Sequence, residues 1–130
     1  MALDAQKSDR LGRYRRGRLS EIVGAAALMA KGYRILARRC RTPYGEIDII
    51  ATRGGKLVCV EVKRRPTRLE GEAALSARQA ARITRAAEFW VHRNPRFRDH
   101  ELRIDALLVV PGRLPRHLPG ALNVVPTGRR

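Results

Sequence analysis

Residues 46–63 read EIDIIATRGGKLVCVEVK and consist of two apolar, β-branched runs on either side of Gly54-Gly55. A glycine pair between two such runs is typical of a tight β-hairpin. Because the turn fixes the register, a loop centred on this pair would place Asp48 directly opposite Glu61. We therefore expect the hairpin to form the centre of the fold.

The two faces of this hairpin differ in character. Side chains alternate between the faces of a strand, so one face is entirely apolar and is predicted to be core. It consists of Ile47, Ile49, Ala51, Val58, Val60 and Val62. The opposite face carries Asp48 and Glu61, with Glu46 opposite Lys63. Like charges placed directly opposite one another destabilise a sheet, so we expect Asp48 and Glu61 to be compensated.

Two kinds of compensation fit the residues. A hard cation such as Mg²⁺ or Mn²⁺ prefers carboxylate, water and phosphate oxygens, and Lys63 would then lie where it could hold a phosphate oxygen or a water. Alternatively, Glu46 and Lys63 form an ordinary cross-strand ion pair, and Asp48 or Glu61 is protonated or paired with an arginine from elsewhere. The first alternative predicts chemistry at this face, and the second predicts none.

The remaining pattern predicts helices on a small mixed sheet. Helical periodicity covers residues 18–31, where Ile22, Ala25, Ala26 and Met29 recur, and residues 72–92, where Ala80, Ile83, Ala87 and Trp90 face inward. Strands are expected at 33–40, 46–51, 57–63, 102–110 and 121–125, with a loop at 111–120. This order predicts an α/β fold. We expect a basic arm at residues 1–16, one domain at 17–127 and a tail at 128–130.

Composition limits the class of protein. The 130 residues are 44% hydrophobic, which is enough for one self-folding domain. The most apolar stretch, residues 23–30, is far shorter than the roughly 20 residues that a membrane span needs. Cys40 and Cys59 have no metal-site or disulfide spacing and are expected to be reduced thiols. A cytoplasmic protein is the expectation.

The charge is strongly positive. Lys and Arg number 28 against 12 Asp and Glu, a formal net charge of +16, and nucleic acid is therefore the expected partner. A general preference for arginine and solvated surface faces would also produce such a composition. Tyr14 and Tyr44 are candidates for stacking on bases. The candidate phosphate contacts are Arg16, Arg18, Arg64, Arg65, Arg78, Arg82 and Arg85.

Residues 45–51 and 58–65, GEIDIIA and VCVEVKRR, resemble the PD-(D/E)XK nuclease signature. Over residues 16–110 the chain resembles the YraN-like family of small bacterial proteins. The resemblance implies a restriction-endonuclease-like core, similar to that of archaeal Holliday-junction resolvases. It further implies that Asp48 and Glu61 bind Mg²⁺ or Mn²⁺, that Lys63 is the catalytic lysine and that Glu21 completes the site. Family members carry a lysine where this chain has Arg78, before Gln79.

Several carboxylates and amides have two interpretations. Glu21 either belongs to the site or is a solvated acid in the first turn of its helix. Asp105 is expected to be a buried or paired structural carboxylate and is a secondary site candidate, as are Glu46 and Gln79.

The leading hypothesis is a metal-dependent endonuclease acting on structured or branched DNA, with DNA favoured over RNA. By analogy with junction-cleaving enzymes, a homodimer is expected. The alternative is a non-catalytic nucleic-acid-binding protein with the same fold.

Overall fold

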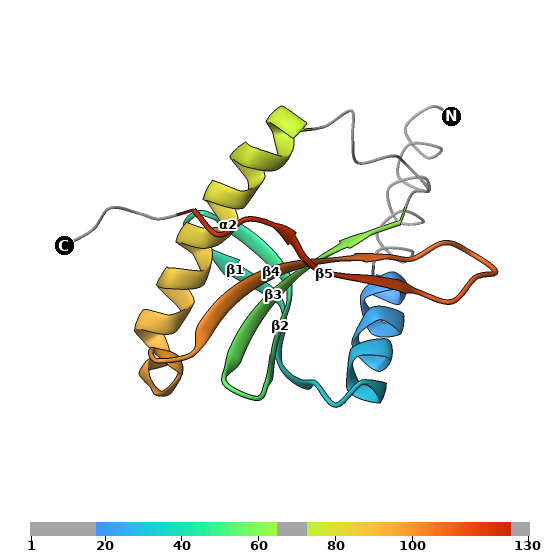
Figure 1. The fold of residues 1–130 in the computed structure, drawn as a ribbon, viewed down its shortest axis with the longest axis horizontal. Helices are drawn as coiled ribbons and strands as arrows, with labels where there is room; N and C mark the ends of the chain where they lie inside the picture. The colour runs from blue at the N-terminus through green and yellow to red at the C-terminus, as the bar shows by residue number, and fades with distance from the viewer. Residues whose placement is uncertain (1–17, 65–72, 126–130) are drawn as a thin grey trace, which may run out of the picture.

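The computed structural model describes residues 18–64 and 73–125, and the expected arm and tail, with Arg16, Arg65 and Tyr14, lie outside these ranges. Five strands form one mixed sheet in the order β1-β2-β3-β4-β5 (Figure 1). Strands β3 and β4 are parallel, and all other neighbours are antiparallel. The strands are β1 (Arg34–Thr42), β2 (Gly45–Arg53), β3 (Lys56–Lys63), β4 (Glu101–Leu108) and β5 (Arg116–Leu122). The predicted α/β class is confirmed, and the architecture is consistent with a restriction-endonuclease-like core.

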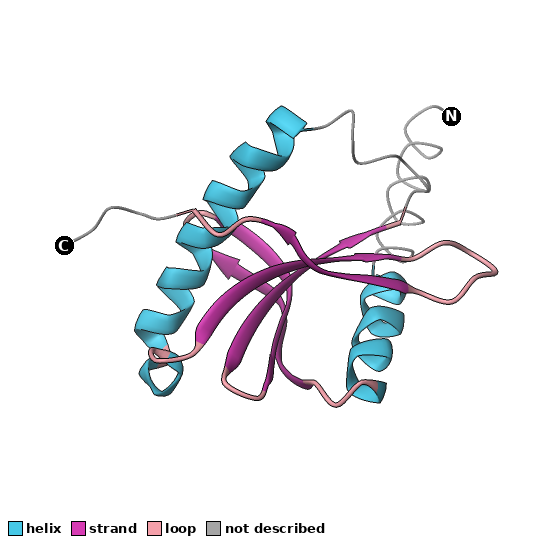
Figure 2. Ribbon diagram, viewed as in Figure 1, coloured by secondary structure: helices cyan, strands magenta, loops and turns pink. Residues whose placement is uncertain are grey.

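A helix covers each face of this sheet (Figure 2). The first helix, residues 18–30, packs on a core cluster that includes Ile49, Val58 and Leu107. On the other face, α2 (Ala73–Arg93) packs on a cluster around Cys59 and Ile83. Since parallel strands need a crossover connection, α2 joins β3 to β4, and the short 3-10 helix η2 (Pro95–Phe97) follows it. The sheet is thus buried on both sides at its centre.

The β2–β3 hairpin has the predicted register over its inner half. The paired residues run from Arg53–Lys56 at the turn to Ile49–Val60. Beyond that point the Asp48 carboxylate accepts a hydrogen bond from the Val62 N–H at 2.8 Å. Side-chain capture of a backbone donor replaces the ladder here. The expected direct pairs, Asp48 with Glu61 and Glu46 with Lys63, are therefore wrong.

Ile47, next to the point where the regular hairpin pairing ends, also lies on the other face of the sheet from the one predicted. Ile47 is fully buried with Ile50 in the cluster beneath α2, not with Ile49 beneath the first helix. The strict alternation of side chains holds only where β2 is paired regularly with both neighbours, and that regularity ends near Asp48. The predicted apolar face is otherwise confirmed.

The first helix presents a different face to the core from the one that its apolar spacing indicates. Its buried side includes Glu21, Ala25 and Leu28, whereas Ile22 and Met29 are 49% and 60% exposed. Gly24 lies on the buried side because a Cβ there would collide with the Leu107 side chain. Close packing of the helix on β4 therefore determines the rotation of the helix.

Strand β5 occupies part of the segment that was expected to be a loop. It begins at Arg116 and ends at Leu122, and it includes Pro119. Proline lacks the N–H of a central strand but is accepted on an edge strand, and β5 pairs with β4 alone among the strands of residues 18–64 and 73–125. The last strand predicted at 121–125 therefore exists but runs over Arg116–Leu122, and of the loop expected over 111–120 only residues 111–115 lie outside a strand.

Candidate active site

Two buried or half-buried carboxylates meet where β2 and β3 part. Asp48 is half-buried and is oriented by its hydrogen bond from Val62, while Glu61 is only 7% exposed on the α2 side of β3. The two groups are close enough for the charge of Asp48 to help raise the pKa of Glu61. The structure therefore brings these two predicted site residues together, although by a geometry other than a direct strand pair.

Burial determines the protonation of the pair. Removal from water raises the pKa of Glu61 to about 7, with a further contribution from Asp48, while Arg82, Lys63 and Gln79 oppose the increase. Burial also raises the pKa of Asp48, against the hydrogen bond from Val62. Carboxyl groups with strongly raised pKa values are frequent at functional sites.

Helix α2 supplies two residues that contact Glu61. The Gln79 amide donates a hydrogen bond to Glu61 Oε1 at 2.9 Å. The Arg82 guanidinium lies 3.7 Å from Glu61 Oε2, too far for a hydrogen bond, and this buried oxygen has no hydrogen-bond partner in the described part of the chain. One oxygen of Glu61 is thus fixed, and the other is left with an ion pair alone.

Arg82 was expected at a phosphate-binding surface but lies within the site. It is half-buried and also donates hydrogen bonds to the backbone carbonyls of Glu46 and Tyr44, at 3.2 and 3.4 Å. Gly45 makes this possible, because a Cβ there would collide with the guanidinium and because its φ of +116° suits glycine. The three-residue spacing of Gln79 and Arg82 places both on one face of α2, which is a signal the sequence does carry.

Glu21 joins the site from the first helix. It is 8% exposed and lies 3.6 Å from Arg39. Burial raises the pKa of Glu21, Arg39 opposes this, and the charges of Asp48 and Glu46 add to it. Of the two interpretations of Glu21, the solvated surface acid is therefore wrong. Glu46 is half-buried at the rim and pairs with Arg41 at 3.6 Å, rather than with Lys63.

Lys63 lies near these acids, and the other candidate phosphate contacts that the structure describes lie on the two helices and after β3. Lys63 is half-buried, and its charge lowers the pKa of both Asp48 and Glu61. Arg18, Arg78 and Arg85 are exposed, and Arg64 is half-buried at the end of β3. The basic residues that the structure describes thus include exposed arginines on both helices.

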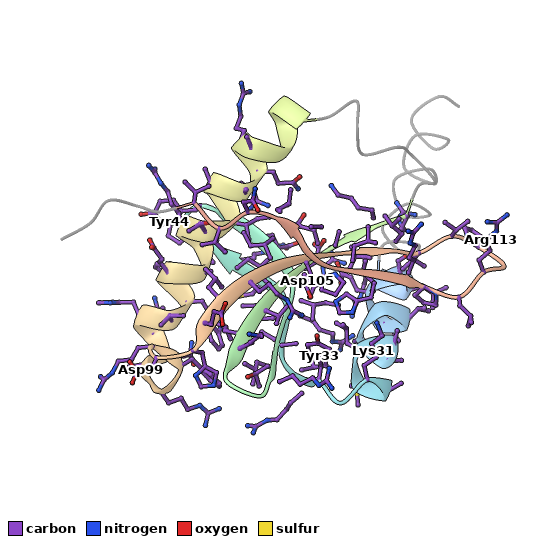
Figure 3. All side chains as sticks on the ribbon, viewed as in Figure 1. Lys31, Tyr33, Tyr44, Asp99, Asp105 and Arg113 are labelled. Atoms are coloured by element: carbon purple, nitrogen blue, oxygen red, sulfur yellow. The ribbon has the colours of Figure 1, made fainter. Side chains whose placement is uncertain are left out.

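Asp105 belongs to a separate network. Its carboxylate is fully buried and accepts hydrogen bonds from Arg103 and the Gly120 N–H, and it pairs with His117 at 2.7 Å. Burial alone would raise the pKa of Asp105, but these partners outweigh burial and hold it below its usual range. Arg103 also donates to the Tyr33 hydroxyl, on the side of the first helix (Figure 3). Asp105 is therefore a structural carboxylate, as its first interpretation predicted.

The donor set bears on whether a metal ion fits. Among residues 18–64 and 73–125, no group of three or more His, Cys, Asp or Glu side chains stands ready to hold a metal ion. Mg²⁺, however, is commonly bound through one or two carboxylates and completes its shell with water and phosphate oxygens. Asp48 and the unpartnered oxygen of Glu61 fit this kind of site.

Part of the alternative explanation also fits. An arginine from elsewhere, Arg82, does lie beside Glu61, and the pKa of both Asp48 and Glu61 is raised. The two carboxylates are therefore partly compensated by protein groups.

Neither helix in the described ranges has an apolar stretch long enough to cross a bilayer.

Comparison with known proteins shows the family to which this chain belongs. The model of the uncharacterised protein family UPF0102 matches residues 20–109, a range that contains Glu21, Asp48, Glu61 and Lys63. A UPF0102 protein of Rhodopseudomonas palustris strain BisB5 is 51% identical over 91% of this chain and 90% of its own length. One of Nitrobacter winogradskyi is 48% identical over 88% of this chain and 97% of its own length. The chain therefore belongs to UPF0102, the YraN-like family that its sequence resembles.

Proposed function

We propose that this protein is a metal-dependent endonuclease that hydrolyses phosphodiester bonds in structured or branched DNA. The observation that carries the proposal is the buried Oε2 of Glu61, which has no hydrogen-bond partner among the described residues and lies within the electrostatic influence of Asp48. An orphaned carboxylate oxygen in a desolvated acidic pair costs stability, so its presence favours a functional role.

In this proposal Asp48 and Glu61 hold Mg²⁺ or Mn²⁺, and Glu21 completes the site from the first helix. The bound ion would supply an activated water and neutralise charge on the scissile phosphate. Gln79 keeps Glu61 in one orientation through its 2.9 Å hydrogen bond, so that the free oxygen faces the site. The Val62 N–H does the same for Asp48.

The basic residues have separate roles. Lys63, close enough to lower the pKa of both acids, would stabilise negative charge that develops on the phosphate or orient the attacking water. The exposed arginines would contact phosphates without reading the base sequence, and the net charge of +16 would favour binding of nucleic acid. Selection by DNA shape rather than by base sequence follows. A homodimer would provide the two sites that symmetric cleavage of a four-way junction requires.

A second function has one observation in its favour. The ion pair between Arg82 and Glu61 gives the acidic site a cation that belongs to the protein itself. A nucleic-acid-binding protein without catalytic activity could keep the fold in this way. Carboxylates near phosphate weaken binding unless a cation intervenes, however, and the neighbouring Lys63 is better explained by catalysis.

The test incubates the purified full-length protein with labelled linear, flapped and four-way DNA, and with RNA, in Mg²⁺, Mn²⁺ or EDTA. Asp48→Asn removes the charge but keeps an acceptor for the Val62 N–H, so the fold should survive. Lys63→Ala removes the proposed charge stabiliser. We expect cleavage of structured DNA with either metal, none in EDTA, and a loss of at least about a hundredfold in each variant.

The control variant is Glu101→Gln, which neutralises an exposed carboxylate at the start of β4, the opposite end of that strand from the residue that pairs with Lys63. It should cleave like the wild type. Cleavage that persists in EDTA or in both site variants would exclude the proposed mechanism. Tight binding of DNA without cleavage under any condition would favour the non-catalytic alternative.

A further inference from the structure

A groove lies along α2, on the C-terminal side of Arg82. Its lining includes Tyr44 from the β1–β2 turn and Arg85 and Phe89 from α2, together with the exposed His92 and Arg98. Its volume of about 780 Å³ lies within the range of small-molecule and cofactor pockets. The groove therefore has room for part of a nucleic-acid strand.

Arg82 connects this groove to the acidic site. Its guanidinium approaches Glu61 on one side and donates to the Tyr44 carbonyl on the other. Arg85 and Phe89 follow Arg82 along the helix by three and seven residues, so all three share one face of α2. A strand whose phosphate lies at Glu61 would reach the groove within its next nucleotides.

The aromatic rings are the feature that this groove adds to the basic surface. Tyr44 is 46% exposed (Figure 3), and its turn is held by hydrogen bonds between Thr42 and the backbone of Tyr44 and Gly45. Phe89 is half-buried and carries the Arg93 guanidinium 5.4 Å from its ring centroid. Such rings stack on unpaired bases of any sequence, whereas the faces of bases inside a duplex are already covered by the neighbouring base pairs.

The charges of the groove match a phosphate backbone. Arg85, Arg98 and His92 are exposed in its lining, and Glu88 is its one acidic member among the described residues. Aromatic rings interleaved with arginines are typical of sites that bind single-stranded nucleic acid. We infer that this groove binds an unpaired segment of DNA next to the scissile phosphate, with Tyr44 and Phe89 stacking on its bases.

This inference rests on the proposed function for its position beside a scissile bond, and it narrows the substrate class to DNA with an unpaired stretch, such as a flap or a fork. The stacking itself can be measured without cleavage. The probe is a short oligonucleotide with one 2-aminopurine, used as a single strand, as a blunt duplex and as a flap, in EDTA. Fluorescence of 2-aminopurine reports stacking, and anisotropy reports affinity.

We expect the wild type to quench the probe in the single strand and the flap but not in the duplex. Tyr44→Ala should lose the quenching and weaken single-strand binding about tenfold, with little effect on the duplex. Tyr44→Phe should behave like the wild type. Arg85→Ala should lower the salt dependence of single-strand binding by about one counterion. Leu114→Ala, which removes an exposed apolar side chain on the β4–β5 loop, is the matched control and should change nothing.

Unchanged quenching and affinity in Tyr44→Ala would overturn the inference, even if cleavage depends on Asp48 and Lys63. Quenching that depends on Tyr44, in a protein that cleaves no substrate, would support the groove and count against the endonuclease. Equal loss of duplex and single-strand binding in Tyr44→Ala would also overturn the inference, because it would show a general effect on the fold.

Discussion

The carboxylate of Asp48 accepts the N–H of Val62 at 2.8 Å and thereby takes over from the backbone ladder between β2 and β3. A residue proposed to bind metal is thus also the residue that satisfies a strand amide at the point where the hairpin opens. One carboxylate oxygen serves the fold, which restricts how Asp48 can turn toward a ligand.

Replacing Glu61 by Gln should stabilise the metal-free protein above neutral pH. The pKa of Glu61 is raised to about 7, so the folded state keeps a proton that the unfolded state loses near 4.5. Stability therefore falls as the pH rises between these values, and the loss is complete above about 7. Glu61→Gln lacks this loss and should gain on the order of 2 kcal/mol at about pH 8, and little at about pH 4. Urea unfolding in EDTA at both values measures this, and equal effects at the two values would contradict it.

Cleavage should accelerate as the pH rises through neutrality. Glu61 must be ionised to bind a cation, and with a pKa of about 7 it is mostly protonated at about pH 6. Because Mg²⁺ competes with the proton, more Mg²⁺ should move the midpoint of the profile to lower pH. Single-turnover rates between about pH 5.5 and 8.5 at two Mg²⁺ concentrations provide the measurement. A midpoint that is independent of Mg²⁺ would argue against Glu61 as a ligand.

Gln79→Ala should weaken the response to Mg²⁺ about ten- to a hundredfold, because the hydrogen bond from Gln79 fixes the orientation of Glu61. Gln79 acts here as a positioning residue, so saturating Mg²⁺ should restore much of the rate. Its neighbour Arg78 is exposed and provides the control. Arg78→Ala should leave the Mg²⁺ dependence unchanged, and a similar change in both variants would contradict the assignment.

Asp105→Asn should destabilise the protein by about 3 kcal/mol or more, because it removes the fully buried charge that pairs with the half-buried Arg103. The matched control is Glu101→Gln. Glu101 lies on β4, as Asp105 does, and forms an exposed ion pair with Lys56 of β3. That change should hardly move the unfolding midpoint. Thermal and urea unfolding of both variants test the contrast, and equal midpoints would show that the Asp105 network is not structural.

The sequence predicts the parts of this fold that depend on periodicity and turn chemistry. Gly54-Gly55 and the two β-branched runs determine the hairpin register, and the helical period determines the inward face of α2. The opening of the hairpin at Asp48 could not be predicted, because alternation does not encode the capture of a backbone amide by a side chain. The edge position of β5 likewise depends on tertiary neighbours, which decide whether Pro119 is tolerated.

The sequence predicted which acidic residues and which lysine lie near one another, but not the contacts that hold them there. Asp48, Glu61, Lys63 and Glu21 were expected and lie together. The burial of Glu21 was left open because the spacing of apolar residues indicates another face of the first helix, and close packing at Gly24 decides between them. Arg82 was assigned to the surface, since helical spacing shows which residues share a face but not which strand that face meets.

The placement of Arg82 implies that the acidic site already carries a tethered positive ion. A divalent cation that binds Glu61 would compete with the guanidinium for its Oε2, and the local charge would change by less than the charge of the incoming ion if the guanidinium moved away. The displaced arginine would remain anchored by its helix, within reach of a phosphate that arrives with the metal. Glu61 would then exchange Arg82 for the metal ion, and Arg82 would exchange Glu61 for the phosphate of the substrate.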